Sequence, residues 1–391
     1  MRTHALGALA VLSLLPSAVA SPPVPAIVAR AAIAVEPALS ANDPRDRALI
    51  AYHHAPIHHQ EVDRTGNNGL EGRADYVTRI DFDGDWDARN DWENAARYPL
   101  PGAAYHSVVE TTSHWFVTYM FFHPRDWADG PFETEHENDS EGVLLVVQRD
   151  HTRFGRLEAA VTIAHSDFYS YVPASGNWSA GNESVDGVLE IDARNGRPET
   201  MQEAGGHALR AHRPGERFDG IVYYPTQGEV TSPSAVARTA PYVLIDVFDA
   251  GGVWDRRDDP KLFARRGVFA GDREGACGSG GILCTTNAAN APWGWDDSDD
   301  GDVRRGDMAI DPVRLVTRYF RIPEPLSSAY THNPFGGDVE RGARNPLIAK
   351  AVRPRLRRPA EEPTLGRAWR KSAGSRQILA AETTLLGSNP R

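Results

Sequence analysis

One short stretch of the chain combines an imidazole with two carboxylates at a spacing that suits a metal ion. It reads His136-Glu137-Asn138-Asp139-Ser140-Glu141, and a strand is expected to begin near Asp139. Residues two apart in an extended segment share a face, so Asp139 and Glu141 should project together. His136 joins them only if the chain turns at Glu137-Asn138. Two carboxylates and one imidazole suit a hard divalent cation or zinc, and the alternative is an exposed acidic loop.

The residues on either side of this stretch carry a family resemblance. The upstream segment reads Phe122-His123-Pro124-Arg125-Asp126, and the downstream one reads Ala164-His165-Ser166-Asp167-Phe168-Tyr169. Over residues 105–175 the chain resembles the necrosis-inducing-protein-like cytolysins and the related vacuolar-sorting-type domains. Their signature is Gly-His-Arg-His-Asp-Trp-Glu, between a strand that ends Phe-Pro-Lys-Asp and a strand that carries another His.

The resemblance implies a divalent-cation site on a β-sandwich. In that family the first His, the Asp and the Glu of the signature, with the upstream Asp, hold the cation. The corresponding ligands here are Asp126, His136, Asp139 and Glu141. Calcium or magnesium is favoured, with zinc or manganese as alternatives. The Arg, second His and Trp of the signature are replaced by Glu137, Asn138 and Ser140, so the cytolytic activity of the family does not follow.

Three nearby side chains are candidates for supporting roles. Glu137 and His165 are candidate second-shell groups or proton carriers, although His165 is equally well interpreted as a satisfied core histidine. His207 follows Gly205-Gly206, and this triplet weakly resembles a Gly-Gly-His turn of the vacuolar-sorting-type domains.

Two pairs of adjacent histidines stand apart from the motif. They are His53-His54 and His58-His59. Such pairs can bind transition metals, but exposed pairs on a loop are commoner.

A segment with two tryptophans and five aspartates, residues 292–302, suggests a ligand platform. Trp293 and Trp295 would stack on a sugar face, while Asp296 and Asp297 would bind hydroxyls or a cation. The alternative is a buried Trp pair that anchors an acidic loop.

The acidic run at residues 81–87 superficially resembles a calcium loop. It fails the EF-hand register, because Trp86 stands where Gly is required and Trp92 where the closing Glu is required. A solvated acidic turn is the simpler interpretation, and a non-EF calcium loop is the alternative.

The elements that must position these residues are mostly strands. Aromatic and β-branched runs separated by polar or Gly/Pro clusters predict a mainly β fold, an antiparallel β-sandwich with a few short helices and long loops. The expected strands are 76–82, 105–112, 115–122, 142–148, 156–164, 188–191, 221–224 and 242–248. Two helices are expected, over residues 45–51 after Asp43-Pro44 and from Asp311-Pro312 to about residue 320.

The charge is unevenly distributed along the chain. The net charge is 42 − 53 = −11, and residues 341–391 hold twelve Lys/Arg and three Glu, so residues 1–340 carry −20. This strongly acidic part of the chain, residues 1–340, disfavours nucleic acid as a partner and suits cation binding.

The ends of the chain predict export. Residues 1–20 have the pattern of a signal peptide, and no later stretch is apolar enough to span a membrane, so we expect a secreted, periplasmic or cell-surface protein. Residues 21–42 are expected to form a linker or a disordered arm, 43–340 a single large domain, and 341–391 a basic, flexible tail. In an exported chain Cys277 and Cys284, which enclose six residues, are most simply a local disulfide.

Three functions remain open at this point. The first is a binding protein, membrane-active in one version, whose metal helps to hold an anionic lipid headgroup or glycan. The second is a metallohydrolase acting on a phosphoester or polysaccharide, and the third is a structural protein with a stabilising metal. The chain lacks the G-x-S-x-G, Walker, H-E-x-x-H and dinucleotide-binding motifs, so serine-hydrolase and nucleotide-dependent functions have no support. The sequence does not indicate an oligomeric state.

Overall fold

The structure is a computed structural model that describes residues 38–129, 135–272, 289–298 and 303–336. The predicted signal peptide, most of the linker, the basic tail and both cysteines lie outside these residues. Those four predictions, and that of a single domain over residues 43–340, therefore stay predictions. Among the described residues, no helix is both long and apolar enough to cross a membrane.

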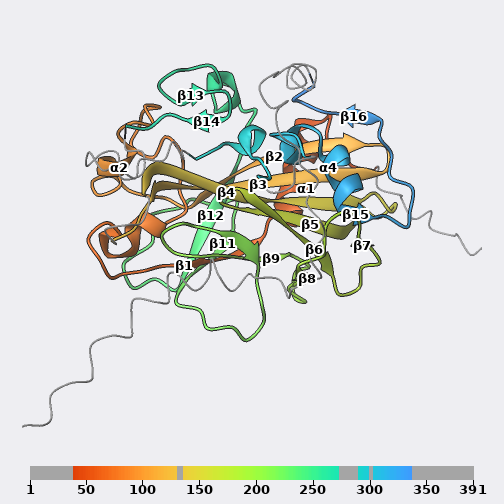
Figure 1. Ribbon diagram of the computed structural model, residues 1–391, viewed down its shortest axis with the longest axis horizontal. Coiled ribbons are helices and arrows are strands. Elements are labelled where there is room, and N and C mark those ends of the chain that lie inside the picture. The colour runs from red at the N-terminus through yellow and green to blue at the C-terminus, as the bar shows by residue number, and fades with distance from the viewer. Residues whose placement is uncertain (1–37, 130–134, 273–288, 299–302, 337–391) are drawn as a thin grey trace, which may run out of the picture. The chain divides into compact units, whose positions relative to one another are not determined.

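The described elements are mainly strands (Figure 1). The helices are α1 (Pro44–His54), η1 (Leu70–Asp75), α2 (Asp91–Asn94), η2 (Trp254–Arg256), η4 (Pro292–Gly294), α3 (Asp307–Ile310) and α4 (Pro312–Tyr319). The strands of the first half are β1 (Ile57–Glu61), β2 (Ala103–Thr111), β3 (His114–Asp126), β4 (His136–Gln148), β5 (Arg156–Ala164), β6 (Asp167–Pro173), β7 (Ser179–Ala180) and β8 (Gly187–Leu189). Those of the second half are β9 (Glu199–Gln202), β10 (Leu209–Ala211), β11 (Gly220–Pro225), β12 (Thr239–Asp246), β13 (Phe263–Arg265), β14 (Val268–Phe269), β15 (Phe320–Arg321) and β16 (Tyr330–His332).

Most of the strands join in one curled sheet. Its order is β10-β9-β1-β11-β12-β2-β3-β4-β5-β6-β8, with β16 added to β2. At one end of this order, β10 returns to contact β5 and β8 near the other end, so the sheet is nearly closed, like a barrel. The predicted mainly β fold is confirmed, but the sheet is not clearly a sandwich. It is also not purely antiparallel, because β1 pairs with β9, β11 with β12, β12 with β2, and β6 with β8 in parallel.

Both predicted helices are present, and their start signals act differently. The carboxylate of Asp43 accepts a hydrogen bond from the Arg45 amide at 2.7 Å, which caps α1 as predicted. Asp311 stands before α4, but its side chain makes no capping bond and instead accepts one from the Tyr330 hydroxyl at 2.5 Å. Pro312 still begins α4, because its fixed φ suits the first helical turn.

One strand prediction is wrong, and β1 is among the strands that were not predicted, for opposite reasons. Residues 76–82 are not a strand and form only a bridge between Thr78 and Phe122, and the Ile80 amide donates to the Tyr105 hydroxyl instead of to a neighbouring strand. Conversely, β1 is too polar to have been predicted. Its inward residue His58 lies 3.0 Å from the Thr200 hydroxyl, and the amide nitrogen of Gln60 donates to the Glu203 carbonyl at 3.1 Å.

Strands β3 and β4 form the buried middle of the sheet, and other elements cover both faces. On one face the Tyr119 hydroxyl donates to the Ala51 carbonyl of α1 at 2.6 Å. On the other face Trp295, next to η4, donates to the Ser140 carbonyl at 3.2 Å, and α3 lies against Thr118. The first of these faces also carries His123 and leads to the predicted metal residues, because alternate strand residues share a face.

Candidate functional site

A single residue with positive φ brings the predicted metal ligands together. His136 and Asp139 are three apart, so a regular strand would place them on opposite faces. Asn138 lies between them with φ +62°, a left-handed conformation that Asn tolerates better than most residues. Its side-chain amide donates to the Ala88 and Ala270 carbonyls, each at 2.8 Å, which holds this turn in place. The local change of direction that the sequence required at Glu137-Asn138 is this one residue, but it lies inside β4, which begins at His136 and not near Asp139 as predicted.

Three of the four predicted ligands form one cluster. His136 Nε2 lies 3.1 Å from Asp126 Oδ2 across the β3–β4 ladder, in which these two residues are direct partners. Ligand atoms of Asp126, His136 and Asp139 all lie within 4.8 Å of one another. His136 Nδ1 lies 2.8 Å from the Asn138 carbonyl, so it donates there, and this bond directs Nε2 at the Asp126 carboxylate and the cluster.

Glu141, the fourth predicted ligand, adjoins this cluster. One oxygen of its carboxylate accepts a hydrogen bond from the His165 amide. The other, Oε2, is buried and has no hydrogen-bond partner among the described residues. Burial raises the pKa of Glu141 well above its usual value, and the charge of Asp139 raises it further. An orphaned buried carboxylate oxygen beside two other carboxylates is the arrangement that a divalent cation satisfies.

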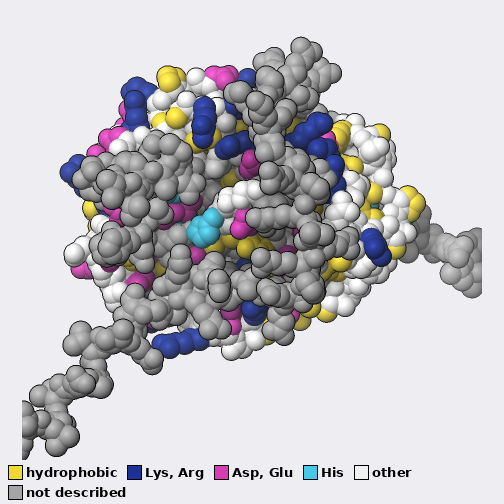
Figure 2. Space-filling view, viewed as in Figure 1, with side chains coloured by type: hydrophobic (Ala, Val, Ile, Leu, Met, Phe, Trp, Pro, Cys, Tyr) yellow, Lys and Arg dark blue, Asp and Glu magenta, His cyan; other side chains and the backbone are white. Residues whose placement is uncertain are grey.

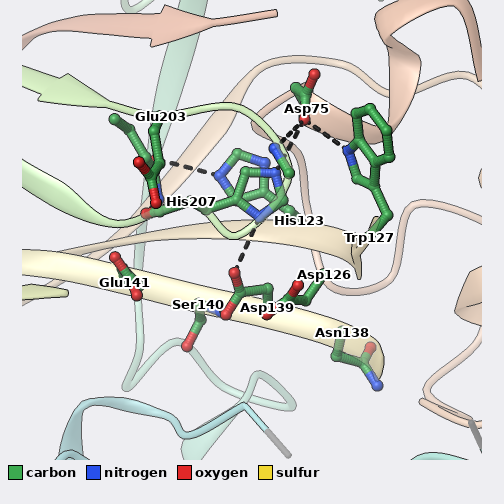
Figure 3. Close-up of polar contacts among 12 residues, drawn as sticks. Asp75, His123, Asp126, Trp127, Asn138, Asp139, Ser140, Glu141, Glu203 and His207 are labelled. Carbon is green, nitrogen blue, oxygen red and sulfur yellow. Dashed lines mark hydrogen bonds and ion pairs between the residues drawn. The ribbon is translucent and has the colours of Figure 1, made fainter. Parts of the chain in front are cut away.

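The structure adds His207, from the turn between β9 and β10, to this group (Figure 3). Its Nδ1 lies 2.9 Å from Asp139 Oδ2, and its Nε2 lies 3.3 Å from Asp75 Oδ1. The ring stacks on that of His123, with centroids 3.8 Å apart. Its only sequence signal was the weak Gly-Gly-His resemblance, whereas nothing in the sequence indicated Asp75.

Asp75 links His207 to the surrounding backbone. Its Oδ1 also accepts from Trp127 Nε1 at 2.8 Å and from the Gly205 amide at 2.9 Å, and its Oδ2 accepts from the Asp63 amide at 2.8 Å. With its acceptors used in this way, Asp75 positions His207, and His207 in turn positions Asp139. This is the carboxylate–imidazole–ligand pattern that orients groups around metal ions.

Buried opposite charges stabilise one another in this site. Burial alone would lower the pKa of His136, but the carboxylates of Asp126 and Asp139 raise it to about 9. Burial opposes a positive charge on His207 too, yet the hydrogen bonds to Asp139 and Asp75 raise its pKa to about 10. Burial opposes the charge of Asp126, but His136 holds the pKa of that carboxyl below its usual value. Without a cation, protons on the imidazoles therefore balance the carboxylates.

His165 marks the solvent side of the cluster. Its side chain is 45% exposed, with Nδ1 3.8 Å from Glu141 Oε1 and Nε2 3.7 Å from Glu203 Oε1. Burial raises the pKa of Glu203 to about 8, and the nearby Glu61 adds to the effect. His165 thus lies beside Glu141 at the edge of the cluster, and its supporting role stays a prediction, whereas Glu203 had no sequence signal.

Glu137, the other candidate second-shell group, serves a different region. Its carboxylate accepts hydrogen bonds from the Trp92 amide at 2.9 Å and the Asp272 amide at 3.0 Å. These bonds tie β4 to α2 and to the segment after β14. Figure 3 shows the neighbouring Asn138 and Ser140 side chains pointing away from the face that carries Asp139.

The predicted Trp/Asp platform does not present an exposed aromatic face. Trp293 is 3% exposed and Trp295 1% exposed, so both indole rings are part of the core. Asp297 is buried as well and bonds the Tyr319 hydroxyl and the Phe168 amide, while Asp296 is half-buried. The two indole rings are buried, as the alternative that the sequence left open requires, whereas residues 299–302 of the acidic loop lie outside the described residues.

The acidic run at 81–87 makes bonds typical of a turn. Asp83 Oδ1 accepts from the Asp85 amide at 3.1 Å, and Asp85 Oδ1 accepts from the Asp87 amide at 2.7 Å. These contacts fit the solvated acidic turn, and the calcium-loop alternative stays a prediction.

No protein-family model matches the chain, and no curated protein matches it significantly. The solved structures similar to it are necrosis and ethylene inducing protein (NLP) structures. One is NLPPya in complex with glucosamine, with 14% identity, a TM-score of 0.32, and coverage of 74% of this chain and 97% of that chain. Another, described as a toxin fold for microbial attack and plant defense, has 13% identity and a TM-score of 0.26, and the match covers 49% of this chain and 79% of that chain. A third is Necrosis and Ethylene inducing Protein 2 from the causal agent of cocoa's Witches Broom disease, with 15% identity, a TM-score of 0.24, and coverage of 44% and 72%. The family resemblance predicted from residues 105–175 is thus also found with solved structures.

Proposed function

We propose that this chain is an exported protein that binds a divalent cation at Asp126, His136, Asp139 and Glu141 and uses it to hold an anionic lipid headgroup or a glycan. The observation that carries the proposal is the convergence of the first three ligands within 4.8 Å beside the buried, unpartnered Oε2 of Glu141.

The donor set indicates which cation fits. Three carboxylates and one imidazole offer mainly hard oxygen donors, which favour calcium or magnesium, with zinc or manganese as alternatives. When bound, the cation would supply a fixed positive charge. The chain's own contribution is to hold the donors in place. The left-handed backbone of Asn138 does this for His136, and the contacts of His207 with Asp75 and Asp139 do it for Asp139.

Charge explains why an anionic ligand would need the cation. Residues 1–340 carry a net charge of −20, and Figure 2 shows acidic side chains beside an exposed histidine near the middle of the face in view. Such a surface repels anions, and a bound divalent cation reverses the sign of the local field. The half-exposed His165 next to Glu141 lies where a ligand would approach.

The test is binding to liposomes and to immobilised glycans, with and without a chelator. The protein should bind either vesicles that contain an anionic lipid or one of the immobilised glycans. We expect chelation to abolish this binding, and we expect His136→Ala to abolish it as well. His151→Ala is the matched control, because His151 is an exposed histidine outside the cluster. Unchanged binding after both chelation and His136→Ala would contradict the proposal.

A metallohydrolase is the second candidate, and the position of His165 favours it. An imidazole that is 45% exposed between two carboxylates is placed to carry a proton at the edge of a metal site. A metal-dependent rate on a phosphoester or polysaccharide that both His136→Ala and His165→Ala abolish would favour this function over binding alone. A tightly bound cation with neither binding nor turnover would instead indicate the stabilising role.

A further inference from the structure

A second group of potential metal ligands lies on three neighbouring strands at one end of the sheet. His59 is on β1, Glu199 begins β9, and His212 follows β10. His59 Nε2 lies 3.0 Å from Glu199 Oε2, and His212 Nδ1 lies 3.2 Å from the same oxygen. Ligand atoms of the three residues all lie within 4.8 Å of one another. We call these three residues the rim cluster.

The rim cluster lies on the other face of the sheet from the Asp126–His136–Asp139 centre. His58 and His59 are consecutive in β1, so their side chains point to opposite faces. His58 turns inward and stacks on Phe121, with ring centroids 3.8 Å apart. His59 therefore points outward, where the side chains of the cluster keep 13% to 21% of their surface exposed. An ion can reach them from solvent.

The two imidazoles are already held beside each other. The rings of His59 and His212 are stacked, with centroids 4.0 Å apart and planes inclined by 8°. In a tetrahedral site with bonds of about 2.0–2.1 Å, neighbouring donor atoms lie roughly 3.3 Å apart. The two nitrogen–oxygen separations are close to this value. Because an imidazole binds a metal ion in its own ring plane and these planes are nearly parallel, one ring must tilt out of the stack to direct both nitrogens at one ion.

One nitrogen of the cluster is enclosed without a hydrogen bond. His212 Nδ1 is buried and makes no hydrogen bond among the described residues, although it lies 3.2 Å from Glu199 Oε2. The separation is short, but the direction is wrong for a bond. A buried imidazole nitrogen that lies next to a carboxylate without a hydrogen bond is a donor atom that a cation could use.

The surrounding charges leave the cluster able to accept a cation. Arg210 binds the carboxylate of Glu216 through both of its terminal nitrogens, which neutralises the nearest additional acid. Glu199 Oε2 then remains the carboxylate oxygen that lies between the two imidazoles, 3.0 Å from His59 Nε2 and 3.2 Å from His212 Nδ1.

We propose that His59, Glu199 and His212 form a second metal site, for Zn²⁺ or a similar transition-metal ion. Two imidazoles and one carboxylate are a donor set typical of zinc, whereas calcium and magnesium prefer oxygen donors alone. Three protein ligands leave one coordination position for water or another ligand. Because its ligands come from β1, β9 and the end of β10, a bound ion would also stabilise the contacts among these three strands.

The test is a Zn²⁺ titration of the full chain, measured by competition with a chromogenic chelator. We expect a zinc site whose affinity falls more than about 100-fold in His212→Ala, since loss of an outer-sphere partner alone costs 10- to 100-fold. His136→Ala should retain this site, and saturating Ca²⁺ or Mg²⁺ should not displace zinc from it. His151→Ala, which removes an exposed histidine elsewhere, should behave as wild type.

A second variant tests whether misfolding, rather than loss of a ligand, explains any loss of zinc binding. Glu199→Gln keeps the size of the side chain but removes its charge, and it should weaken zinc binding while leaving the circular-dichroism spectrum and the metal-free melting temperature unchanged. Co²⁺ added in place of zinc should give visible absorption in wild type and lose it in both variants. Equal zinc affinity in wild type, His212→Ala and Glu199→Gln would overturn the proposal, as would a zinc site that only His136→Ala removes.

Discussion

The centre around Asp139 and the rim cluster use the same side-chain types under different conditions of burial and charge. In the centre, carboxylates outnumber imidazoles, and His207 and Asp75 are fully buried. In the rim cluster, two imidazoles share one carboxylate and all three side chains remain partly exposed. Burial among carboxylates raises the pKa of His136 and His207, whereas burial beside another imidazole lowers that of His59.

This difference shows that the neighbours of a histidine, more than its exposure, decide its preferred charge. A buried imidazole between carboxylates is stable as a cation, so a metal ion must compete with a proton there. Burial and the neighbouring His212 favour the neutral form of His59 instead, so this ring offers its lone pair without first losing a proton. The two regions should therefore respond differently to substitution, to metal ions and to pH.

The largest expected effect is on the stability of the buried centre. His207→Ala leaves Asp139 and Asp75 buried without the cation between them, so the free energy of unfolding should fall by about 3–5 kcal/mol. His59→Ala, at the partly exposed rim, should cost about 1 kcal/mol or less. Denaturant unfolding of metal-free protein measures both. His207→Asn tolerates the positive φ at this position and separates backbone strain from lost charge. Equal losses for His207→Ala and His59→Ala would remove the distinction between the regions.

The next effect is on calcium or magnesium affinity. We expect His136→Ala to weaken it more than about 100-fold, roughly 2.7 kcal/mol, since it removes a direct ligand rather than an outer partner. His212→Ala should leave it unchanged. Calorimetric titration of the two variants compares the regions directly. A calcium affinity that depends on His212 would contradict the proposal that the two sites are separate.

The pH dependence of metal-free protein should have opposite signs for the two regions. The pKa values of His136 and His207 are raised to about 9 and about 10, so their contribution to stability is complete below about pH 6.5 and is lost as pH rises through 9–10. The lowered pKa of His59 gives the reverse, because the unfolded chain binds more protons and stability is lost as pH falls below about 6.5.

Each such group contributes at most about 1.4 kcal/mol per pH unit, and less at the rim, where solvent screens the charges. Melting temperatures from pH 5 to pH 10 would show this for wild type, for His207→Asn and for His59→Gln. His207→Asn should flatten the alkaline loss, and His59→Gln the acid loss. A curve that neither variant changes would contradict the assignment of these groups.

The smallest effect should occur at His165, between the centre and solvent. Because its side chain is 45% exposed, His165→Ala should change the free energy of unfolding by about 0.5 kcal/mol or less. The calcium affinity of this variant should fall by about 100-fold at most, the upper end of the range for loss of an outer partner. A larger loss of affinity would show that His165 contacts the ion.

The sequence predicted most of the central sheet because β2 to β5 are rich in aromatic and β-branched residues. It missed β1, whose inward His58 and Gln60 are polar and are satisfied only by partners on other segments. It also predicted a strand at 76–82, where the composition is right but the backbone bonds go to side chains. In both cases the hydrogen-bonding partners on other segments determine whether the residues form a strand. The local periodicity of the sequence carries no information about these partners.

The site was predictable to the extent that it is local. Asp139 and Glu141 follow from spacing, and the need for a turn near Asn138 follows from His136. Asp75 and Glu203 come from segments more than 60 residues away on either side of Asp139, and no local pattern joins them to it. The rim cluster is similar, since His59 and Glu199 meet only because β1 pairs with β9 in parallel.

The buried turn residue Asn138 has a consequence for how the protein can be produced. Asn138-Asp139-Ser140 is a sequon for N-linked glycosylation, as are Asn177-Trp178-Ser179 and Asn182-Glu183-Ser184. Asn177 and Asn182 are exposed, but the amide of Asn138 is enclosed and donates to two carbonyls. A eukaryotic secretory pathway that modifies Asn138 on the nascent chain would therefore block the native turn. The native fold is compatible with oligosaccharides at the other two sequons, and bacterial expression avoids the conflict at this one.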